Sequence, residues 1–162
     1  MAVEFKIEGA EEIKRRLGLL PQRLGQNAAR RALRRGANVI RDDARANAKR
    51  LNDPTTPQDI AKNIVVKGMK RGDERRQKVV GMRVGVLGGA KRVARASGEI
   101  QGAGRANPGG DTYYWRFLEF GTSKMPAKPF MRPAMNNKAS QAMDAATTAM
   151  ITEADKELRK IK

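Results

Sequence analysis

The chain has 162 residues, enough for one domain with a modest core, and 34 lysines and arginines against 17 acidic residues give it a formal net charge of +17. It has no cysteine and no histidine, which excludes disulfides, thiolate and imidazole metal ligands, a cysteine nucleophile and histidine acid–base catalysis. No stretch approaches the roughly 18 apolar residues of a membrane span, and the start lacks the apolar run of a signal peptide, so we expect neither.

The apolar residues are mostly small. Hydrophobic residues make up 40% of the chain but aromatic residues only 4%, and alanine supplies much of the apolar share. Because small side chains bury little area each, we expect a thin core that is completed against neighbouring copies in a homo-oligomer. The charge indicates a polyanionic partner, namely nucleic acid, an acidic membrane or an acidic protein; the alternative is a solvated basic surface without a partner.

Three elements are predicted before residue 52. Val3–Ile7 alternates apolar and charged residues and predicts a short strand, and Ala10–Leu20 predicts a short helix with acidic residues in its first turn. Helical periodicity is clearest from Gln22 to about Arg50. The apolar stripe of this helix contains Ala29, Leu33, Gly36, Ala37, Ile40, Ala44, Ala48 and Leu51. Much of its remaining surface is basic: Arg30, Arg31, Arg34, Arg35, Arg41 and Arg45.

The middle of the chain predicts a small antiparallel sheet. After a Pro-rich loop at 52–57, Ile60–Val66 and Lys78–Leu87 have the composition and alternation of strands, and the polar turn Lys67–Gln77 between them favours a hairpin. The next segment, Gly88–Asp111, is rich in glycine, alanine and arginine. We expect it to be a mobile loop that becomes ordered on assembly, with a short helix inside it as the alternative.

Five of the seven aromatic residues fall within eight positions: Tyr113, Tyr114, Trp115, Phe117 and Phe120. Tyr113, Trp115 and Phe117 alternate with other residues, and the chain has few other large side chains. We therefore interpret the cluster as bulk for the core or for a subunit interface. The alternative is a platform on which bases of single-stranded nucleic acid stack.

A final helix is predicted from about Arg132 to Lys160. Its stripe contains Met135, Ala139, Ala142, Met143, Ala146 and Met150, followed by Leu158 and Ile161. Together the elements predict an α+β fold, in which a small, mostly antiparallel sheet accompanies a long basic N-terminal helix and a long C-terminal helix, in one domain over residues 1–162. We expect the larger side chains of the two stripes to pack in core or subunit contacts: Leu33, Ile40, Met135, Met143 and Met150.

No arrangement of residues predicts catalysis. The acidic residues are scattered, and the neighbours Asp42 and Asp43 point about 100° apart on a helix. No histidine is present to activate Ser97, Ser123 or Ser140, and none of these serines begins a Ser-x-x-Lys motif. We therefore expect no enzymatic activity, no cofactor and no metal.

The most specific pattern in the chain lies between Tyr113 and Ala134. After the aromatic cluster it reads Glu119-Phe120-Gly121-Thr122, a short basic link, and then Pro126-Ala127-Lys128-Pro129-Phe130-Met131-Arg132-Pro133-Ala134. This segment, with the order of elements before it, resembles the tail-component family of lambdoid, Hong Kong 97-type long-tailed bacteriophages. The chain departs from the family's usual pattern between Leu51 and Ile60, where Asn-Asp-Pro-Thr-Thr-Pro-Gln-Asp replaces a Pro followed by a Thr-Gly-x-Leu-type turn.

The resemblance implies a structural virion protein at the head–tail junction or at the top of the tail, a neck or minor tail protein that acts in tail completion and head–tail joining. Such a protein is expected to form a ring of six copies around the path of the double-stranded genomic DNA. The DNA is expected to pass through without sequence-specific contacts. The implied partners are head-connector, tail-terminator or tail-tube proteins. Assembly is expected in the cytoplasm of the host bacterium.

The residues of the motif are expected to have structural roles. Gly121 permits a sharp turn. Phe130 is the expected anchor on the core, and Glu119 is expected to pair with Arg132 or to cap a backbone group. Three prolines are expected to hold an extended approach and the entry into the last helix: Pro126, Pro129 and Pro133.

The alternative function is that of a basic nucleic-acid-binding protein. The charge and the arginine-lined helix support it, but no recognised nucleic-acid-binding motif does. In a tail component, tight contacts with phosphates would impede the passage of DNA during ejection. We therefore expect one set of cations to face acidic protein partners or the outer surface: Arg30, Arg31, Arg34, Arg35 and Arg45. A smaller set on the glycine-rich loop is expected to reach the lumen: Lys91, Arg92 and Arg95.

Overall fold

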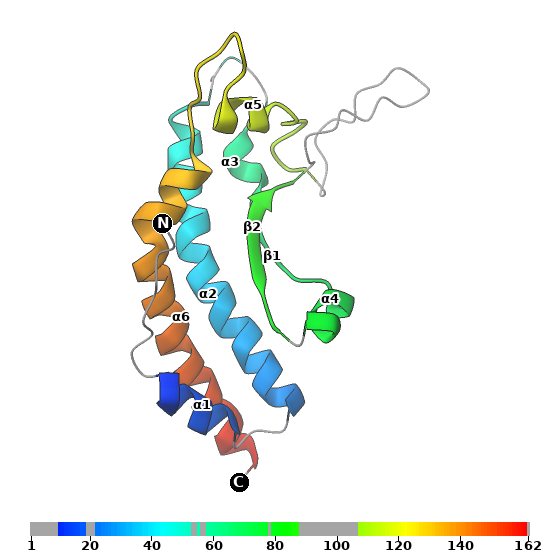
Figure 1. Ribbon diagram of the computed structural model, residues 1–162, viewed down its shortest axis with the longest axis vertical. Helices are drawn as coiled ribbons and strands as arrows, with labels where there is room; N and C mark the ends of the chain where they lie inside the picture. The colour runs from blue at the N-terminus through cyan, green and yellow to red at the C-terminus, as the bar shows by residue number, and fades with distance from the viewer. Residues whose placement is uncertain are drawn as a thin grey trace. The chain divides into compact units, whose positions relative to one another are not determined.

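The computed structural model describes residues 10–18, 22–52, 55, 58–77, 79–87 and 107–161. The fold is α+β, as the sequence predicts, because long helices accompany a small antiparallel sheet of two strands (Figure 1). In chain order the elements are α1 (Ala10–Gly18), α2 (Gln22–Lys49), α3 (Ile60–Asn63), β1 (Ile64–Gly68), α4 (Arg71–Gln77), β2 (Met82–Val86), α5 (Trp115–Phe120) and α6 (Met131–Ile161). The strand predicted at Val3–Ile7 lies outside the described residues.

The three helices predicted from periodicity are confirmed as α1, α2 and α6. α1 has Glu11 and Glu12 in its first turn, where carboxylates interact favourably with the helix dipole. α2 has 28 residues and α6 has 31. Pro133 is compatible with α6 because it stands in the first turn, where a backbone N–H has no intrahelical acceptor.

The two strands form the predicted antiparallel hairpin, but each strand is shorter than predicted. The N–H of Leu87 donates to the carbonyl of Asn63 (2.8 Å), and the N–H of Met69 donates to that of Gly81 (3.0 Å). These bonds flank the ladder and place Ile64 opposite Val86 and Gly68 opposite Met82.

The strand predicted from Ile60 is wrong for its first four residues, which form α3. The side chain of Asp59 accepts a hydrogen bond from the N–H of Ala61 (2.9 Å) and so caps the start of this helical turn. The turn predicted at Lys67–Gln77 is also more regular than expected, because it contains α4 with Asp73 and Glu74 in the first turn.

The alternation seen from Tyr113 to Phe117 does not correspond to a strand. Residues Trp115–Phe120 form α5, which ends where the N–H of Gly121 donates to the carbonyl of Phe117 (2.9 Å). On a helix, side chains three or four positions apart share a face, so the parity argument does not apply to this segment.

The chain divides into two compact units. Unit 1 is built from Met1–Val39, Gly68–Arg83 and Ser140–Lys162, and unit 2 from Ile40–Lys67 and Val84–Ala139. α2 and α6 therefore each contribute residues to both units.

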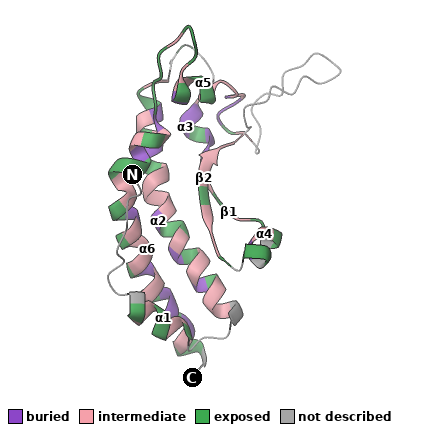
Figure 2. Cartoon of the chain, in the orientation of Figure 1, coloured by how far each residue is buried: buried purple, intermediate pink, exposed green. Residues whose placement is uncertain are grey.

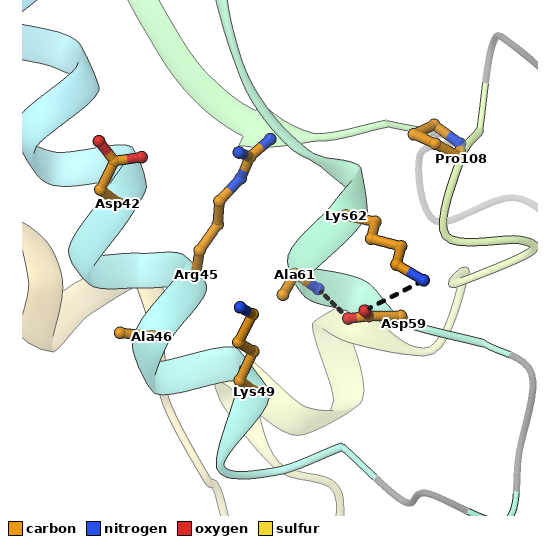
Figure 3. A pocket seen from close by; sticks show the side chains of 8 residues that line it. All are labelled: Asp42, Arg45, Ala46, Lys49, Asp59, Ala61, Lys62 and Pro108. Atoms are coloured by element: carbon orange, nitrogen blue, oxygen red, sulfur yellow. Dashed lines mark hydrogen bonds and ion pairs between the residues drawn. The ribbon is translucent and has the colours of Figure 1, made fainter.

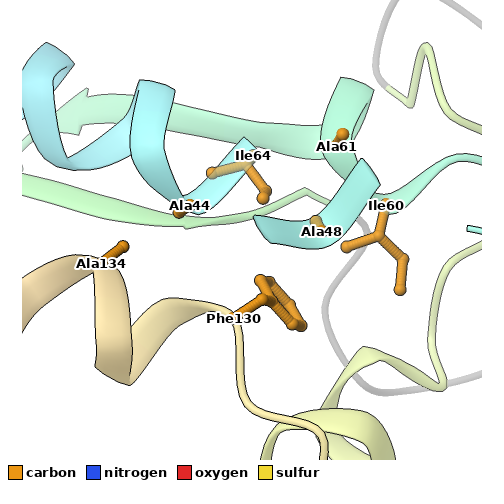
Figure 4. Packing of buried hydrophobic residues seen from close by; sticks show 7 residues of the cluster. All are labelled: Ala44, Ala48, Ile60, Ala61, Ile64, Phe130 and Ala134. Carbon is orange, nitrogen blue, oxygen red and sulfur yellow. The ribbon is translucent and has the colours of Figure 1, made fainter. Parts of the chain in front are cut away.

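Unit 2 contains a cluster of buried hydrophobic residues around Phe130. Phe130, which is 0% exposed, lies among residues from α2, α3, β1 and α6 (Figure 4). Four of the cluster's seven buried members are alanines, namely Ala44, Ala48, Ala61 and Ala134. The other three are Ile60, Ile64 and Phe130. Trp115 and Leu118 of α5 pack against this cluster from its margin. Phe130 is buried in this cluster, as expected of an anchor on the core; the anchoring role itself stays a prediction.

Among the residues of unit 1 that the structure describes, every buried hydrophobic residue is an alanine: Ala28, Ala32, Ala142, Ala149 and Ala154 (Figure 2). Gly36 of α2 is buried as well, and a Cβ at this position would overlap the carbonyl oxygen of Ala142 on α6. The two helices thus approach closely where neither has a large side chain. The thin, alanine-based core expected from composition is present.

The predicted apolar stripes are only partly correct. On α2, Ala44 and Ala48 are buried as expected, but in the N-terminal half the buried positions are Ala28 and Ala32, one residue before the predicted Ala29 and Leu33. Alanine gives neighbouring faces of a helix almost equal hydrophobicity, so the composition alone does not determine which face is buried.

The larger side chains of the stripes are less buried than the alanines. Ile40 packs against the core cluster, whereas Leu33, Met143 and Met150 are half-buried. Met135 is 51% exposed, so it is not part of the chain's own core. Its expected packing in a subunit contact stays a prediction.

Candidate functional site

Glu119 joins α5 to the start of α6. Its side chain is 2% exposed, and its two carboxylate oxygens accept hydrogen bonds from the backbone N–H groups of Phe130 (2.8 Å), Met131 (2.9 Å) and Arg132 (2.9 Å). The guanidinium of Arg132 lies 3.4 Å from the carboxylate and donates to the carbonyl of Glu119 (2.6 Å). Both expected roles of Glu119, pairing with Arg132 and capping a backbone group, are confirmed.

This environment keeps Glu119 charged. Burial has the largest single effect and raises the pKa of its carboxyl group. The hydrogen bonds from the N–H groups of Met131, Phe130 and Arg132 and from the Arg132 side chain oppose it, and together they hold the pKa below its ordinary value. The only acidic side chain between Thr112 and Ala139 is therefore an ionised group that is turned inward.

A tight reversal follows Glu119. Gly121 has a φ of 75°, which a residue with a side chain rarely adopts, and a Cβ there would come within 3.0 Å of backbone atoms of Ala127 and Met125. The N–H of Thr122 donates to the carbonyl of Met125 (2.9 Å), and the N–H of Lys128 donates to that of Leu118 (2.7 Å). The turn predicted at Gly121 is confirmed.

The aromatic cluster is divided between inside and outside. Tyr114 and Trp115 pack against the core of unit 2, whereas Phe117 is 49% exposed and Phe120 is 64% exposed. The guanidinium of Arg132 lies over the Phe120 ring, 5.3 Å from its centre. Tyr114 and Trp115 therefore add bulk to the core, as interpreted from the sequence. Phe117 and Phe120 are exposed at the surface of unit 2.

Three arginines of the predicted basic cluster have acidic partners within unit 1. Arg30 pairs with Glu74 of α4 (2.6 Å), Arg31 with Glu153 (2.5 Å) and with Glu157 of α6, and Arg35 with Glu153 (3.3 Å). The side chains of these glutamates are at most 7% exposed. α2 and α6 are therefore connected by charge as well as by their alanines.

Arg31 is at the centre of this ion-pair network. Its hydrogen bond is the largest of the effects that lower the pKa of Glu153, and likewise of those that lower the pKa of Glu157. The pKa of Arg31 itself is raised, chiefly by its hydrogen bond with Glu153. The sequence offered one signal for this network, since Glu153 and Glu157 are four positions apart and share a face of α6.

The other basic residues named from the sequence differ in their surroundings. Arg45 donates from Nε (3.0 Å) and Nη2 (2.7 Å) to the carbonyl of Ile64 in unit 2, and so it fastens α2 to the start of β1. Arg34 is exposed and makes no ion pair with a carboxylate in the described part of the chain. Lys91, Arg92 and Arg95 lie outside the described residues.

A recess of about 580 Å³ opens in unit 2 beside Arg45 (Figure 3). Three cations and two carboxylates line it: Arg45, Lys49, Lys62, Asp42 and Asp59. Arg45 is held by the Ile64 carbonyl, and Lys62 lies 3.8 Å from Asp59. The charges largely balance within the recess, so it does not concentrate the positive charge that binding a polyanion requires.

Asn63 organises the end of the glycine-rich segment, and the sequence gave no sign of this. Its Nδ2 donates to the carbonyl of Gly110 (2.9 Å) and to Oγ1 of Thr112 (2.9 Å), and its Oδ1 accepts from the N–H of Gly109 (2.8 Å). Residues 107–111 of the predicted mobile loop are therefore packed in unit 2. Residues 88–106 of that loop lie outside the described residues.

The described residues contain no group of three or more acidic side chains that could hold a metal ion. None of the described helices combines the length and hydropathy that crossing a lipid bilayer requires.

The model of a protein family described as "Bacteriophage HK97-gp10, putative tail-component" matches residues 11–121, which is more than half of the chain. The match includes parts of both units and ends at Gly121, so Pro126–Ala134 lies beyond it. No curated protein and no solved structure matches the chain.

Proposed function

Because the chain belongs to the bacteriophage HK97-gp10 tail-component family, we propose that it is a structural, non-enzymatic virion protein. In this proposal it forms a ring at the head–tail junction or at the top of the tail. The ring is required for tail completion and head–tail joining. The family match includes parts of both units, which supports treating residues 1–162 as one tail-component domain. We propose that assembly takes place in the cytoplasm of the host bacterium.

The observation that carries the ring proposal is how the chain distributes its large and small apolar side chains. Among the described residues, nine of the twelve buried hydrophobic ones are alanines, while Phe117, Phe120 and Met135 are about half exposed or more. A monomer that buries its small residues and exposes large ones gains hydrophobic free energy when a neighbour covers the large ones. This supports a homo-oligomer, for which the family suggests six copies.

The charge of such a ring indicates acidic protein neighbours. Six copies would carry about six times +17, close to +100 formal charges, which requires compensation. Arg30, Arg31 and Arg35 are already paired with glutamates of the same chain, so they are less available to grip phosphates. This supports a conduit through which double-stranded DNA passes with weak contacts, between head-connector, tail-terminator or tail-tube proteins.

The proposal is tested by removing the gene of this protein from a phage that encodes it. We expect lysates with filled heads and with tails that fail to join, and restoration of joined particles when the purified protein is added. Electron microscopy of the restored particles should place extra density at the neck or at the top of the tail. Infectious particles of normal appearance without the protein would contradict the proposal.

The same purified protein separates a tail component from a basic nucleic-acid-binding protein. A tail component is expected to join heads and tails at about 0.5 M salt, where contacts between DNA phosphates and lysine or arginine are strongly weakened. Tight DNA binding with a steep dependence on salt, together with absence from purified virions, would favour the nucleic-acid-binding alternative.

A further inference from the structure

Unit 2 carries an exposed aromatic patch, which we define as Phe117, Phe120, Arg132 and Met135. Phe117 and Phe120 are three positions apart on α5 and so lie on one face, and their rings are 49% and 64% exposed. Arg132 covers part of the Phe120 ring at 5.3 Å, and Met135, which is 51% exposed, follows one turn later on α6. The chain has only four phenylalanines and buries mainly alanine, so leaving two of them in water is costly unless a partner covers them.

Among residues 112–139, which carry the patch, every exposed charge is basic. Residues 112–139 contain five cations and a single carboxylate. Four of the cations are exposed, namely Arg116, Lys124, Lys128 and Arg132. The carboxylate, Glu119, is buried, and its charge is compensated by its hydrogen-bond donors. A surface with apolar centre and cationic rim is complementary to an apolar recess rimmed by Asp and Glu.

A second copy of this chain is poorly suited to supply that rim. Two aromatic patches face to face would bring their exposed cations together without a surface carboxylate between them. In the described part of the chain, four acids stand outside an ion pair: Glu11, Asp43, Asp111 and Asp144. The other nine described acids make ion pairs: Glu12, Asp42, Asp59, Asp73, Glu74, Glu119, Glu153, Asp155 and Glu157.

Double-stranded DNA does not match the patch either. It presents phosphates to the cations, but its base faces are stacked inside the duplex. Covering the two Phe rings would require unstacking and kinking the duplex, at a cost of a few kcal/mol per base step.

We propose that the aromatic patch is the docking surface for a different, acidic virion protein, which covers Phe117 and Phe120 and pairs with the cations around them. This inference rests on the proposed function, since it takes the partner from the assembled particle. It names the face of the chain that makes the heterotypic contact and the chemistry of the partner's surface.

Photo-crosslinking in the assembled particle identifies what covers the patch. A phage carrying the substitution Phe120→p-benzoyl-phenylalanine is irradiated after purification, and crosslinked peptides are identified by mass spectrometry. We expect a crosslink to a different virion protein, in a segment with an excess of Asp and Glu. A crosslink to a second copy of this chain, a crosslink to DNA, or no crosslink in particles that contain the protein would overturn the inference and leave the proposed function standing. Absence of the protein from the particle would instead contradict the proposed function.

Binding measurements test the two halves of the patch separately, with purified tails and heads lacking the protein as the probe. The double variant Phe117→Ser, Phe120→Ser is expected to weaken association about tenfold or more, as hot-spot aromatics do. The triple variant Arg116→Glu, Lys124→Glu, Lys128→Glu should weaken it comparably at low salt. The control for the double variant is Val79→Ser, which replaces another half-exposed apolar residue. The control for the triple variant is the combination Lys67→Glu, Lys70→Glu, Arg83→Glu, which reverses three exposed cations outside the patch.

The controls keep the experiment decisive. The patch variants replace exposed side chains, so we expect their thermal unfolding to be unchanged. Unchanged unfolding shows that weaker association does not result from misfolding. If the control variants weaken association as much as the patch variants do, net charge or general apolarity is responsible, and the docking surface is refuted.

Discussion

Glu119 shows how one side chain can connect two parts of a motif that are separated by a turn. Its carboxylate accepts three backbone N–H groups at the start of α6, although it belongs to α5. The first N–H groups of a helix have no intrahelical acceptor, so this interaction satisfies groups that would otherwise be unpaired beside a buried ring. Within the motif, the acid and the proline-rich approach therefore depend on each other.

Replacing this carboxylate by an amide tests the connection. Glu119→Gln exchanges one accepting oxygen for a donating NH₂ group that faces backbone N–H groups, and we expect it to lower the free energy of unfolding by about 1–3 kcal/mol. Chemical denaturation with circular dichroism measures the change. Asp144→Asn, which neutralises an exposed acid in the middle of α6, is the control and should change stability by less than about 0.5 kcal/mol.

Phe130 lies fully buried in the hydrophobic cluster of unit 2. Phe130→Ala removes the largest side chain that is fully buried among the described residues. It is expected to cost about 3–5 kcal/mol, because the alanines around it are too small to fill the cavity. Phe117→Ala deletes the same group from a half-exposed position and should cost less than about 1 kcal/mol. Equal losses in the two variants would show that Phe130 is not the anchor of unit 2.

At the level of elements, a close approach of α2 and α6 in unit 1 depends on Gly36. Its missing Cβ leaves room for the carbonyl of Ala142, which belongs to the backbone and has little freedom to move. We expect Gly36→Ala to destabilise the protein by about 1–3 kcal/mol, despite the better helix propensity of alanine. Thermal unfolding measures the loss.

Gly72 in α4 is the matched control for Gly36. A Cβ at Gly72 meets no atom within 4 Å, so Gly72→Ala should be neutral or stabilising by up to about 1 kcal/mol. If both substitutions stabilise the protein, the helices do not pack as closely as the structure places them.

The elements also show what the sequence can and cannot predict. Long helices such as α2 and α6 repeat their pattern over many turns, so their extents were predicted to within about one residue. Ile60–Asn63 was misassigned because a run of four residues is too short to distinguish helix from strand, and a capping Asp59 decided it. The hydrogen bonds of Asn63 were not predictable, since they join residues some 46 to 49 positions apart without a pattern. For the candidate site, the roles of Glu119, Gly121 and Phe130 followed from the motif, whereas the exposure of Phe117 and Phe120 required the structure.

For the molecule as a whole, the ion pairs of Arg31 predict sensitivity to acid. The pKa values of Glu153 and Glu157 lie below the ordinary 4.5 in the folded state, so the folded chain binds fewer protons than the unfolded chain near that pH. The stability that these groups contribute is present above about pH 4.5 and is lost as the pH falls through the lower folded values. The melting temperature should therefore decrease steeply below about pH 4.5.

Arg31→Gln is expected to lower the melting temperature at pH 7 and to flatten its decrease in acid, because Glu153 and Glu157 lose the partner that keeps their pKa values low. Arg34→Gln removes a cation from the same helix that has no ion pair among the described carboxylates, and it should leave the pH profile unchanged. A profile that is the same for both variants would show that the network does not act in solution.

The alanines buried in unit 1 have a further consequence, which concerns temperature. The heat capacity change of unfolding grows with the apolar area that becomes exposed, and a methyl group contributes little of it. A small heat capacity change gives a broad, shallow stability curve, in which the free energy of unfolding varies little between cold and warm conditions. The hydrophobic effect weakens on cooling, but it contributes little to the folding free energy of unit 1. We therefore expect unit 1 to lose little of its stability in the cold.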